Sequence, residues 1–233
     1  MDAQRIFAGG MEYLLLLVSL SAREAFKAWT AERCGDSTGR LLGRVSLNPF
    51  RHLELVGSLI LPVVLLLFGA PVFGWGRPVP VLEKNLREPY RAGLLIAAAG
   101  PFCSFVIGLL GTVALLSAVR ITGQPGLQAA DGSILALLHQ WDHAETPHFP
   151  LIFTLTALVT INAFLTVFHL IPLPPLDGGR IALHLLPPDW AAKLAAIRPS
   201  GFMIGMLLAL LVVGVLVLPL LFGILTVLIH FVA

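Results

Sequence analysis

Charged residues are scarce in this chain of 233 residues: Asp, Glu, Lys and Arg together make up only 12%. Soluble domains contain about 25% of these residues and about 45–50% apolar ones, whereas 57% of this chain is hydrophobic. The composition therefore excludes an ordinary soluble domain and predicts an integral membrane protein. The net charge is only +2, and the basic residues flank apolar segments without forming a patch, so nothing points to nucleic acid as a partner.

Cysteine is also rare in this sequence. Cys34 and Cys103 are the two cysteines of the sequence, and neither has neighbours typical of a redox or metal site. We interpret both as small apolar residues. A signal peptide is not expected either, because Glu12 directly precedes the first apolar run.

Long apolar runs are what the sequence does contain. A membrane-spanning helix needs about 20 residues, and four runs provide them: Met11–Thr30, Ala92–Val119, Leu151–Ile171 and Phe202–Ala233. A fifth run, Val56–Phe73, is interrupted by glycines and prolines. We therefore expect an all-α polytopic membrane protein, with residues 1–233 forming one membrane domain.

The basic residues indicate how the fifth run meets the membrane. If it crosses, the arginines and lysines on either side of it lie on opposite faces, and the usual cytoplasmic excess disappears. If it enters and leaves on one side, most basic residues share a face. We therefore expect a re-entrant hairpin, with residues 31–91 and 172–201 on the cytoplasmic side of the membrane.

Three charges stand inside the first apolar run. Arg23, Glu24 and Lys27 lie within one and a half helical turns, and each costs roughly 2.5–3.5 kcal/mol near the centre of a membrane helix. They must therefore have partners or a function. Their spacing is that of the zinc-binding H-E-x-x-H motif, with Arg and Lys in place of the two histidines.

Further motifs follow this one in a fixed order. They are G-R-V-S-L-N-P-F-R-H at 43–52, F-G-W-G-R-P-V-P-V at 73–81, A-G-P at 99–101, Asn162, and L-I-P-L-P-P-L-D-G-G-R at 170–180. The series resembles the site-2 protease family of intramembrane zinc metalloproteases. The resemblance covers a core over residues 11–180, and residues 202–233 form a further C-terminal membrane segment.

This resemblance implies a fold and a site. The fold is a transmembrane helical core with a small β element between its first two helices. The resemblance places Glu24 at the general-base position and Asp177 at a zinc-ligand position, with Arg23 and Lys27 at the two histidine positions. Neither cationic side chain offers a lone pair to a metal.

The charges suggest what replaced the metal. We hypothesise that Arg23 and Lys27 act as counter-charges to Glu24 and Asp177, because intramembrane charges usually pair. On this interpretation no cofactor is needed. The chain is then a pseudoprotease that binds a transmembrane helix or an active relative without cutting it.

Other interpretations remain open. Asp177 can serve simply as a helix cap, and Arg23 and Lys27 can snorkel to an interface. An active zinc protease with a rebuilt ligand set is the main functional alternative, for which His169 is the nearest extra ligand. A proton or ion relay built on the four charges is a third.

Five residues are candidates for contacting a substrate or partner: Asn162, His169, Trp75, Pro78 and Pro80. The alternating prolines favour an extended sheet edge, which in the family is thought to receive the substrate as an added strand. Asn162 can instead form an interhelical hydrogen bond, and His169 can be a packing residue. Membrane lipid is the other expected partner.

The connection from Arg120 to Pro150 contains several residue types that bind metals. They are His139, Asp142, His143, Glu145 and His148. Because no helix is assured among its Gly, Pro and Thr residues, we expect a solvated loop here rather than a metal site.

Overall fold

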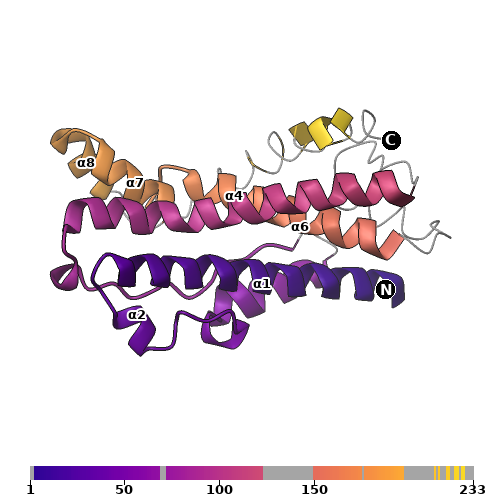
Figure 1. The fold of residues 1–233 in the computed structure, drawn as a ribbon, viewed down its shortest axis with the longest axis horizontal. Helices are drawn as coiled ribbons and strands as arrows, with labels where there is room; N and C mark the ends of the chain where they lie inside the picture. Colours follow the sequence, from indigo (N-terminus) through magenta and orange to yellow (C-terminus); the bar gives the residue numbers. More distant parts are fainter. Residues whose placement is uncertain are drawn as a thin grey trace.

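The computed structural model describes residues 3–68, 72–122, 149–174 and 176–196, with isolated positions between 213 and 228. Three long helices form the core: α1 (Ala3–Arg33), α4 (Pro89–Thr122) and α6 (Phe149–Leu170). They pack side by side, and α4 runs antiparallel to the other two (Figure 1). Both α4 and α6 are long and apolar enough to cross a membrane, as expected for a helical membrane protein.

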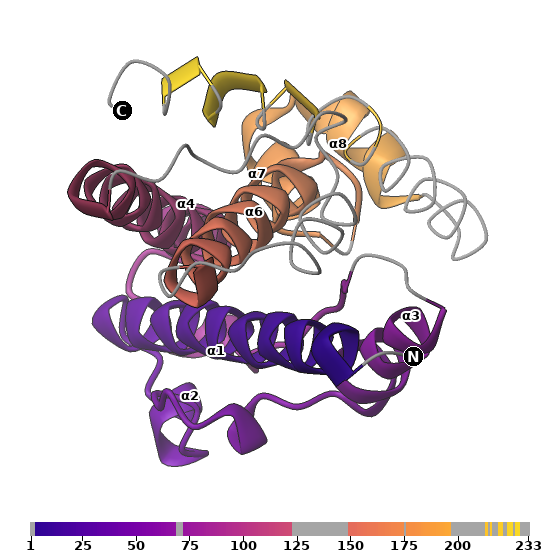
Figure 2. The same ribbon diagram turned by 90° about the vertical axis from the view of Figure 1, so that its right-hand side faces the viewer.

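Shorter elements surround this bundle. They are α2 (Thr38–Leu41), α3 (Leu61–Leu67), α7 (Asp177–Leu185), α8 (Pro188–Ala195), a π-helix over Leu55–Ile60, and 3-10 turns at Pro49–Arg51 and Glu83–Asn85. Figure 2 shows α2 on the side of α1 away from α4 and α6, and α3 beside the N-terminal end of α1. The end of α1, the start of α4 and both α7 and α8 lie at one end of the bundle (Figure 1).

Apolar side chains and small residues hold the three long helices together. Leu16 and Leu20 of α1 pack against Ile161 and Leu165 of α6. Where α4 meets α6, a Cβ added to Gly111 would lie 3.1 Å from the side chain of Val159, so this position has little room for more than glycine. Small residues of this kind let membrane helices approach closely.

The fifth apolar run doubles back as a hairpin. The amide of Arg77 donates to the carbonyl of His52 at 2.8 Å, and the amide of Trp75 donates to that of Gly57 at 3.2 Å. The two ends of the run therefore meet. The side chain of Leu66, in the middle of the run, packs on Gly9 of α1, and near its start the carbonyl of Ser58 accepts from the Tyr13 hydroxyl. A return of this kind is the geometry of a re-entrant segment, and the membrane face from which it starts stays a prediction.

The small β element expected between the first two core helices is absent from the described residues, which contain no strand. Residues 72–82 are extended, but their hydrogen bonds go to separate partners. The amide of Trp75 donates to the carbonyl of Gly57 in the π-helix, and the amide of Arg77 donates to that of His52. The amide of Leu82 donates to the carboxylate of Asp36. Pro78 and Pro80 have no amide hydrogen to give, so no ladder forms.

Two predictions fall outside the described residues. They are the C-terminal membrane segment Phe202–Ala233, apart from isolated positions, and the five metal-type residues between Arg120 and Pro150.

Candidate functional site

The C-terminal half of α1 carries three of the site's charges. The chain has neither glycine nor proline from Met11 to Cys34, which allows one continuous helix here. Side chains four residues apart share a helix face, and Arg23 and Lys27 both face the bundle. They are 1% and 6% exposed, and Glu24 is 5% exposed. Burial of this degree contradicts the alternative in which the two cations snorkel to an interface.

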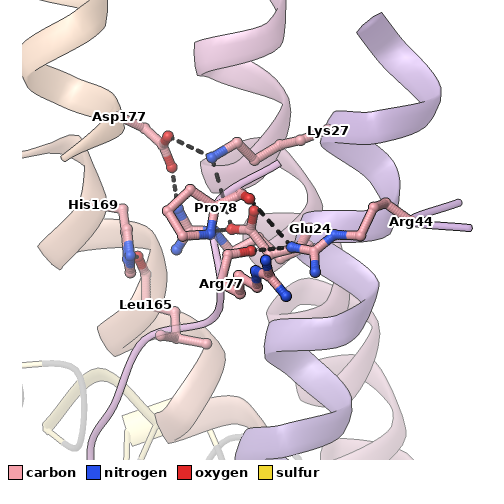
Figure 3. Close-up of polar contacts among 9 residues, drawn as sticks. Glu24, Lys27, Arg44, Arg77, Pro78, Leu165, His169 and Asp177 are labelled. Atoms are coloured by element: carbon pink, nitrogen blue, oxygen red, sulfur yellow. Dashed lines mark hydrogen bonds and ion pairs between the residues drawn. The ribbon is translucent and has the colours of Figure 1, made fainter. Parts of the chain in front are cut away.

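The turn after α6 brings the fourth charge, Asp177, to the same place. The Lys27 ammonium donates to Asp177 Oδ1 at 2.8 Å, and the Arg23 guanidinium donates to Asp177 Oδ2 (Figure 3). Asp177 is itself buried. Both oxygens of this carboxylate are therefore bonded to cations of α1.

Two glycines explain how Asp177 reaches this position. A Cβ on Gly178 would overlap the backbone of Leu170, and one on Gly179 would overlap that of Leu173. The first turn of α7 therefore packs directly on the backbone of the preceding turn. The D-G-G sequence serves this close packing, which directs Asp177 toward α1.

Asp177 does not cap α7. The helix begins at Asp177, its N-cap position is Leu176, and no side-chain capping bond forms. The carboxylate bonds instead to the two α1 cations, so the simple capping role that the sequence left open is not observed.

Glu24 completes what we call the charged tetrad: Arg23, Glu24, Lys27 and Asp177. Its Oε1 lies 3.6 Å from the Lys27 ammonium and 3.8 Å from Arg23 Nε. Two positive and two negative groups give a formal charge of zero. Charges inside a membrane domain are expected to pair in this way, facing the bundle interior.

A glycine of α4 lets the tetrad fit between the helices. A Cβ on Gly100, in the A-G-P motif, would lie 2.9 Å from Arg23 Nε and 3.0 Å from Asp177 Oδ2. The helix backbone therefore approaches the ion pairs more closely than a side chain would permit.

Arg44 is a functional candidate that the sequence reasoning missed. This arginine is 5% exposed, and its guanidinium donates to the carbonyls of Arg51, Arg77 and Pro78 (Figure 3). It ties both ends of the hairpin together next to Glu24. The sequence sign of this role was one arginine inside the G-R-V-S-L-N-P motif, and an arginine in a loop is usually solvated.

The two predicted partner-binding residues of α6 make contacts within the bundle. Asn162 donates to the Ser19 hydroxyl of α1 at 3.0 Å and to the carbonyl of Leu158 at 2.9 Å, which is the interhelical alternative. The ring Nδ1 of His169 donates to the carbonyl of Leu165 at 3.0 Å. His169 lies beside the tetrad in Figure 3, but it forms no hydrogen bond with Asp177 there.

The predicted partner-binding residues of the extended segment have different surroundings. Trp75 packs its indole ring on Gly57, where a Cβ would overlap the ring, so this side chain holds the hairpin. Pro78 presents its carbonyl to Arg44, 3.2 Å away, and lies next to the tetrad (Figure 3). Pro78 and Pro80 are exposed.

The residues present do not fit a zinc ion. A catalytic zinc takes three protein ligands, and the described residues include no group of three or more His, Cys, Asp or Glu side chains placed to hold a metal. Two of the three family ligand positions carry cations, which have no lone pair for a metal. Asp177 at the third already bonds to both of them.

Comparison with curated proteins identifies relatives along most of the chain. A Bacillus subtilis protein named "Putative zinc metalloprotease YwhC" is 32% identical over 200 residues, which are 85% of this chain and 80% of that protein. "Putative zinc metalloprotease Rip2" of Mycolicibacterium smegmatis is 30% identical over 189 residues, 81% of this chain and 62% of the relative.

A shorter similarity links the chain to a "Putative zinc metalloprotease" of Streptococcus pneumoniae, 30% identical over 119 residues, 48% of this chain and 28% of that protein. No protein-family profile matches the sequence. No solved structure matches it either.

Proposed function

The chain belongs to the site-2 protease family of zinc metalloproteases, and we propose that it acts there as a pseudoprotease that binds a transmembrane partner without cutting it. One observation carries the proposal: both oxygens of Asp177 bond to Arg23 and Lys27, cations that stand at the family's two histidine positions. The tetrad is neutral without a metal. A divalent cation entering it would meet two fixed positive charges at close range.

Glu24 supports the same conclusion. At the family's general-base position a carboxylate activates a metal-bound water. Here Glu24 lies within 4 Å of two cations and serves as their counter-ion. We therefore assign Glu24 a structural role.

The extended segment supplies a place for a partner. Trp75 and Arg77 turn their amides toward the hairpin, and backbone groups of an extended chain alternate between its two sides. Gly76, between them, lies against both the hairpin and α1, because its Cβ position is 3.4 Å from the carbonyl oxygen of His52 and 3.4 Å from Glu24 Cγ. An extended stretch of a partner's membrane segment would add beside the exposed Pro78 and Pro80 by strand addition, next to the tetrad.

The partner we propose is a transmembrane helix of a membrane protein, with an active relative of this family as the other candidate. The proposal includes the bacterial inner membrane as the location, with residues 31–91 and 172–201 on the cytoplasmic face. Helix α1 ends, and α4 and α7 begin, toward the same end of the bundle (Figure 1). This arrangement supports placing residues 31–91 and 172–201 on one face.

Zinc content tests the pseudoprotease assignment. We would measure it by elemental mass spectrometry on untagged, detergent-purified protein, and expect less than about a tenth of an equivalent, because a catalytic site needs three ligands. The double variant Arg23→His/Lys27→His should bind zinc, since it restores the family ligands. A full equivalent in the native chain, lost in Asp177→Asn, would make the chain an active-type metalloprotease with other ligands.

A second experiment tests binding without cleavage. Replacing Pro80 by p-benzoylphenylalanine places a photocrosslinker on the extended segment, and the same residue at Leu109, exposed on α4, is the control. Crosslinks at 80 to membrane proteins of full length support the proposal. Crosslinks to shortened fragments, absent when Glu24 is replaced by Gln, would contradict it.

A further inference from the structure

An apolar groove runs along the outside of the bundle between α1 and α4. None of the four tetrad residues lines it. Its volume is about 480 Å³, within the range of roughly 300–1,000 Å³ usual for small-molecule sites. Residues 45–47 form one wall, and α4 contributes Cys103 and Ile107. The third wall is a stripe of α1.

The α1 stripe creates the hollow. Ala22, Ala25, Phe26 and Trp29 line the groove, and their spacing places them on one helix face. The two alanines leave space, while the rings of Phe26 and Trp29 stack with centroids 5.4 Å apart and form one end. From Ala22 to Trp29 the helix rises about 10 Å, which is the length of this wall.

The surroundings of the groove indicate what fills it. On α4, Phe102 and Phe105 are 57% and 54% exposed, and on the adjoining loop Leu47 and Phe50 are 70% and 82% exposed. Large exposed apolar side chains on a helix that can span a membrane face lipid. The groove is continuous with this surface, so its opening faces lipid acyl chains.

A cation stands at the aromatic end of the groove. The guanidinium of Arg33 lies over the Trp29 ring, 4.9 Å from its centroid, at the residue where α1 ends. Within the described part of the chain no carboxylate forms a salt bridge with it, and Arg33 is exposed. Trp is enriched at membrane interfaces, and guanidinium groups bind phosphate through charge-assisted hydrogen bonds.

We propose that this groove is a phospholipid site, with one acyl chain along Ala22 and Ala25 and the lipid phosphate on Arg33. The apolar walls disfavour a polar ligand, and the Arg33 guanidinium at the interfacial end matches an anionic phosphate. The site is separate from the tetrad, so it stands whether or not the chain cleaves a substrate.

The test is lipid retention measured by native mass spectrometry. The full chain is reconstituted in nanodiscs of phosphatidylglycerol and phosphatidylcholine, transferred to detergent, and its bound lipid counted. We expect one retained phospholipid. Ala25→Leu and Ile107→Trp, which fill the groove from opposite walls, should each lower its occupancy at least fivefold, and Arg33→Gln at least threefold. Leu109→Phe and Arg91→Gln, changes outside the groove, should leave it unchanged.

A second measurement uses Cys103 as a probe inside the groove and needs no filling variant. In a Cys34→Ser background, bound phospholipid should slow alkylation of Cys103 by an apolar maleimide at least threefold relative to lipid-free protein in detergent. Equal rates, or lipid retention unaffected by all three groove variants, would overturn the proposal. A dimer that Ala25→Leu abolishes would overturn it too, because a second copy of the chain would then be the occupant.

Discussion

Lys27 Nζ lies 2.8 Å from Asp177 Oδ1, although 150 positions of sequence separate the two residues. This ion pair joins the C-terminal half of α1 to the start of α7. Arg23 reaches the second oxygen of the same carboxylate. The pair therefore ties two distant parts of the chain, at positions that the resemblance assigns to zinc ligands.

Removing the lysine should destabilise the protein strongly. Lys27→Ala leaves Asp177 with one cation and Glu24 with a weaker partner, and breaking a buried pair costs about 3–5 kcal/mol. Thermal unfolding in detergent measures the effect. Lys84→Ala, at an exposed position, is the matched control and should change stability by less than about 0.5 kcal/mol. Equal melting temperatures for the two variants would contradict the counter-charge role.

The same pair predicts a specific coupling. In the double variant Lys27→Met/Asp177→Asn both charges are absent, so neither is left buried without its partner. Its loss of stability should be smaller than the sum of the two single losses by about 0.5–3 kcal/mol. Additive losses would mean that the two side chains act independently.

Arg44 should hold the hairpin closed. Arg44→Gln removes a charged group that donates to three carbonyls, and the lost hydrogen bonds cost about 1.5–3 kcal/mol. Amide hydrogen exchange over residues 72–82 should rise in this variant. Arg51→Gln, an exposed arginine of the same loop, should leave exchange nearly unchanged, and similar exchange in both variants would rule out the role.

Gly178 should not tolerate a side chain. An added Cβ overlaps the Leu170 backbone, which cannot move aside as a flexible side chain would, so Gly178→Ala should cost about 1–3 kcal/mol. Gly10→Ala is the control, because no atom lies within 4 Å of its Cβ position and alanine favours a helix interior by up to about 1 kcal/mol. A Gly178→Ala protein as stable as Gly10→Ala would refute the packing argument.

Asp36 should make stability depend on acid pH. Burial raises the pKa of this carboxyl, but hydrogen bonds from Thr38, Asn85 and the amide of Leu82 outweigh it and set the pKa below its ordinary value of 3.8. The unfolded chain then binds the proton more readily. The stabilisation is fully present above about pH 4–5 and is lost as the pH falls through the ordinary value toward the folded one.

Melting temperatures at pH 7 and below pH 4 measure this contribution. Asp36→Asn should lower stability at pH 7 and lose less on acidification than the native chain does. Glu83→Gln, at an exposed position nearby, should follow the native profile. An Asp36→Asn profile parallel to the native one would show that another group is responsible.

The length and apolarity of their segments were enough to predict α4 and α6 as possible membrane-spanning helices. The placement of basic residues predicted that the Val56–Phe73 run doubles back, because such features can be read along the sequence. The sequence also indicated that Arg23, Glu24 and Lys27 need partners, since the cost of a buried charge follows from composition. The family motifs identified Asp177 as the residue to expect there.

How these parts meet depends on contacts between segments that are far apart in the sequence. Which oxygen bonds to which cation depends on the close packing of α7 at Gly178, and the partners of Arg44 are carbonyls that every residue possesses. The expected β element is absent from the described residues for a related reason. Alternating prolines predict extended backbone, but a strand forms only where a neighbouring backbone runs in register, and here separate loop and side-chain groups take those hydrogen bonds instead.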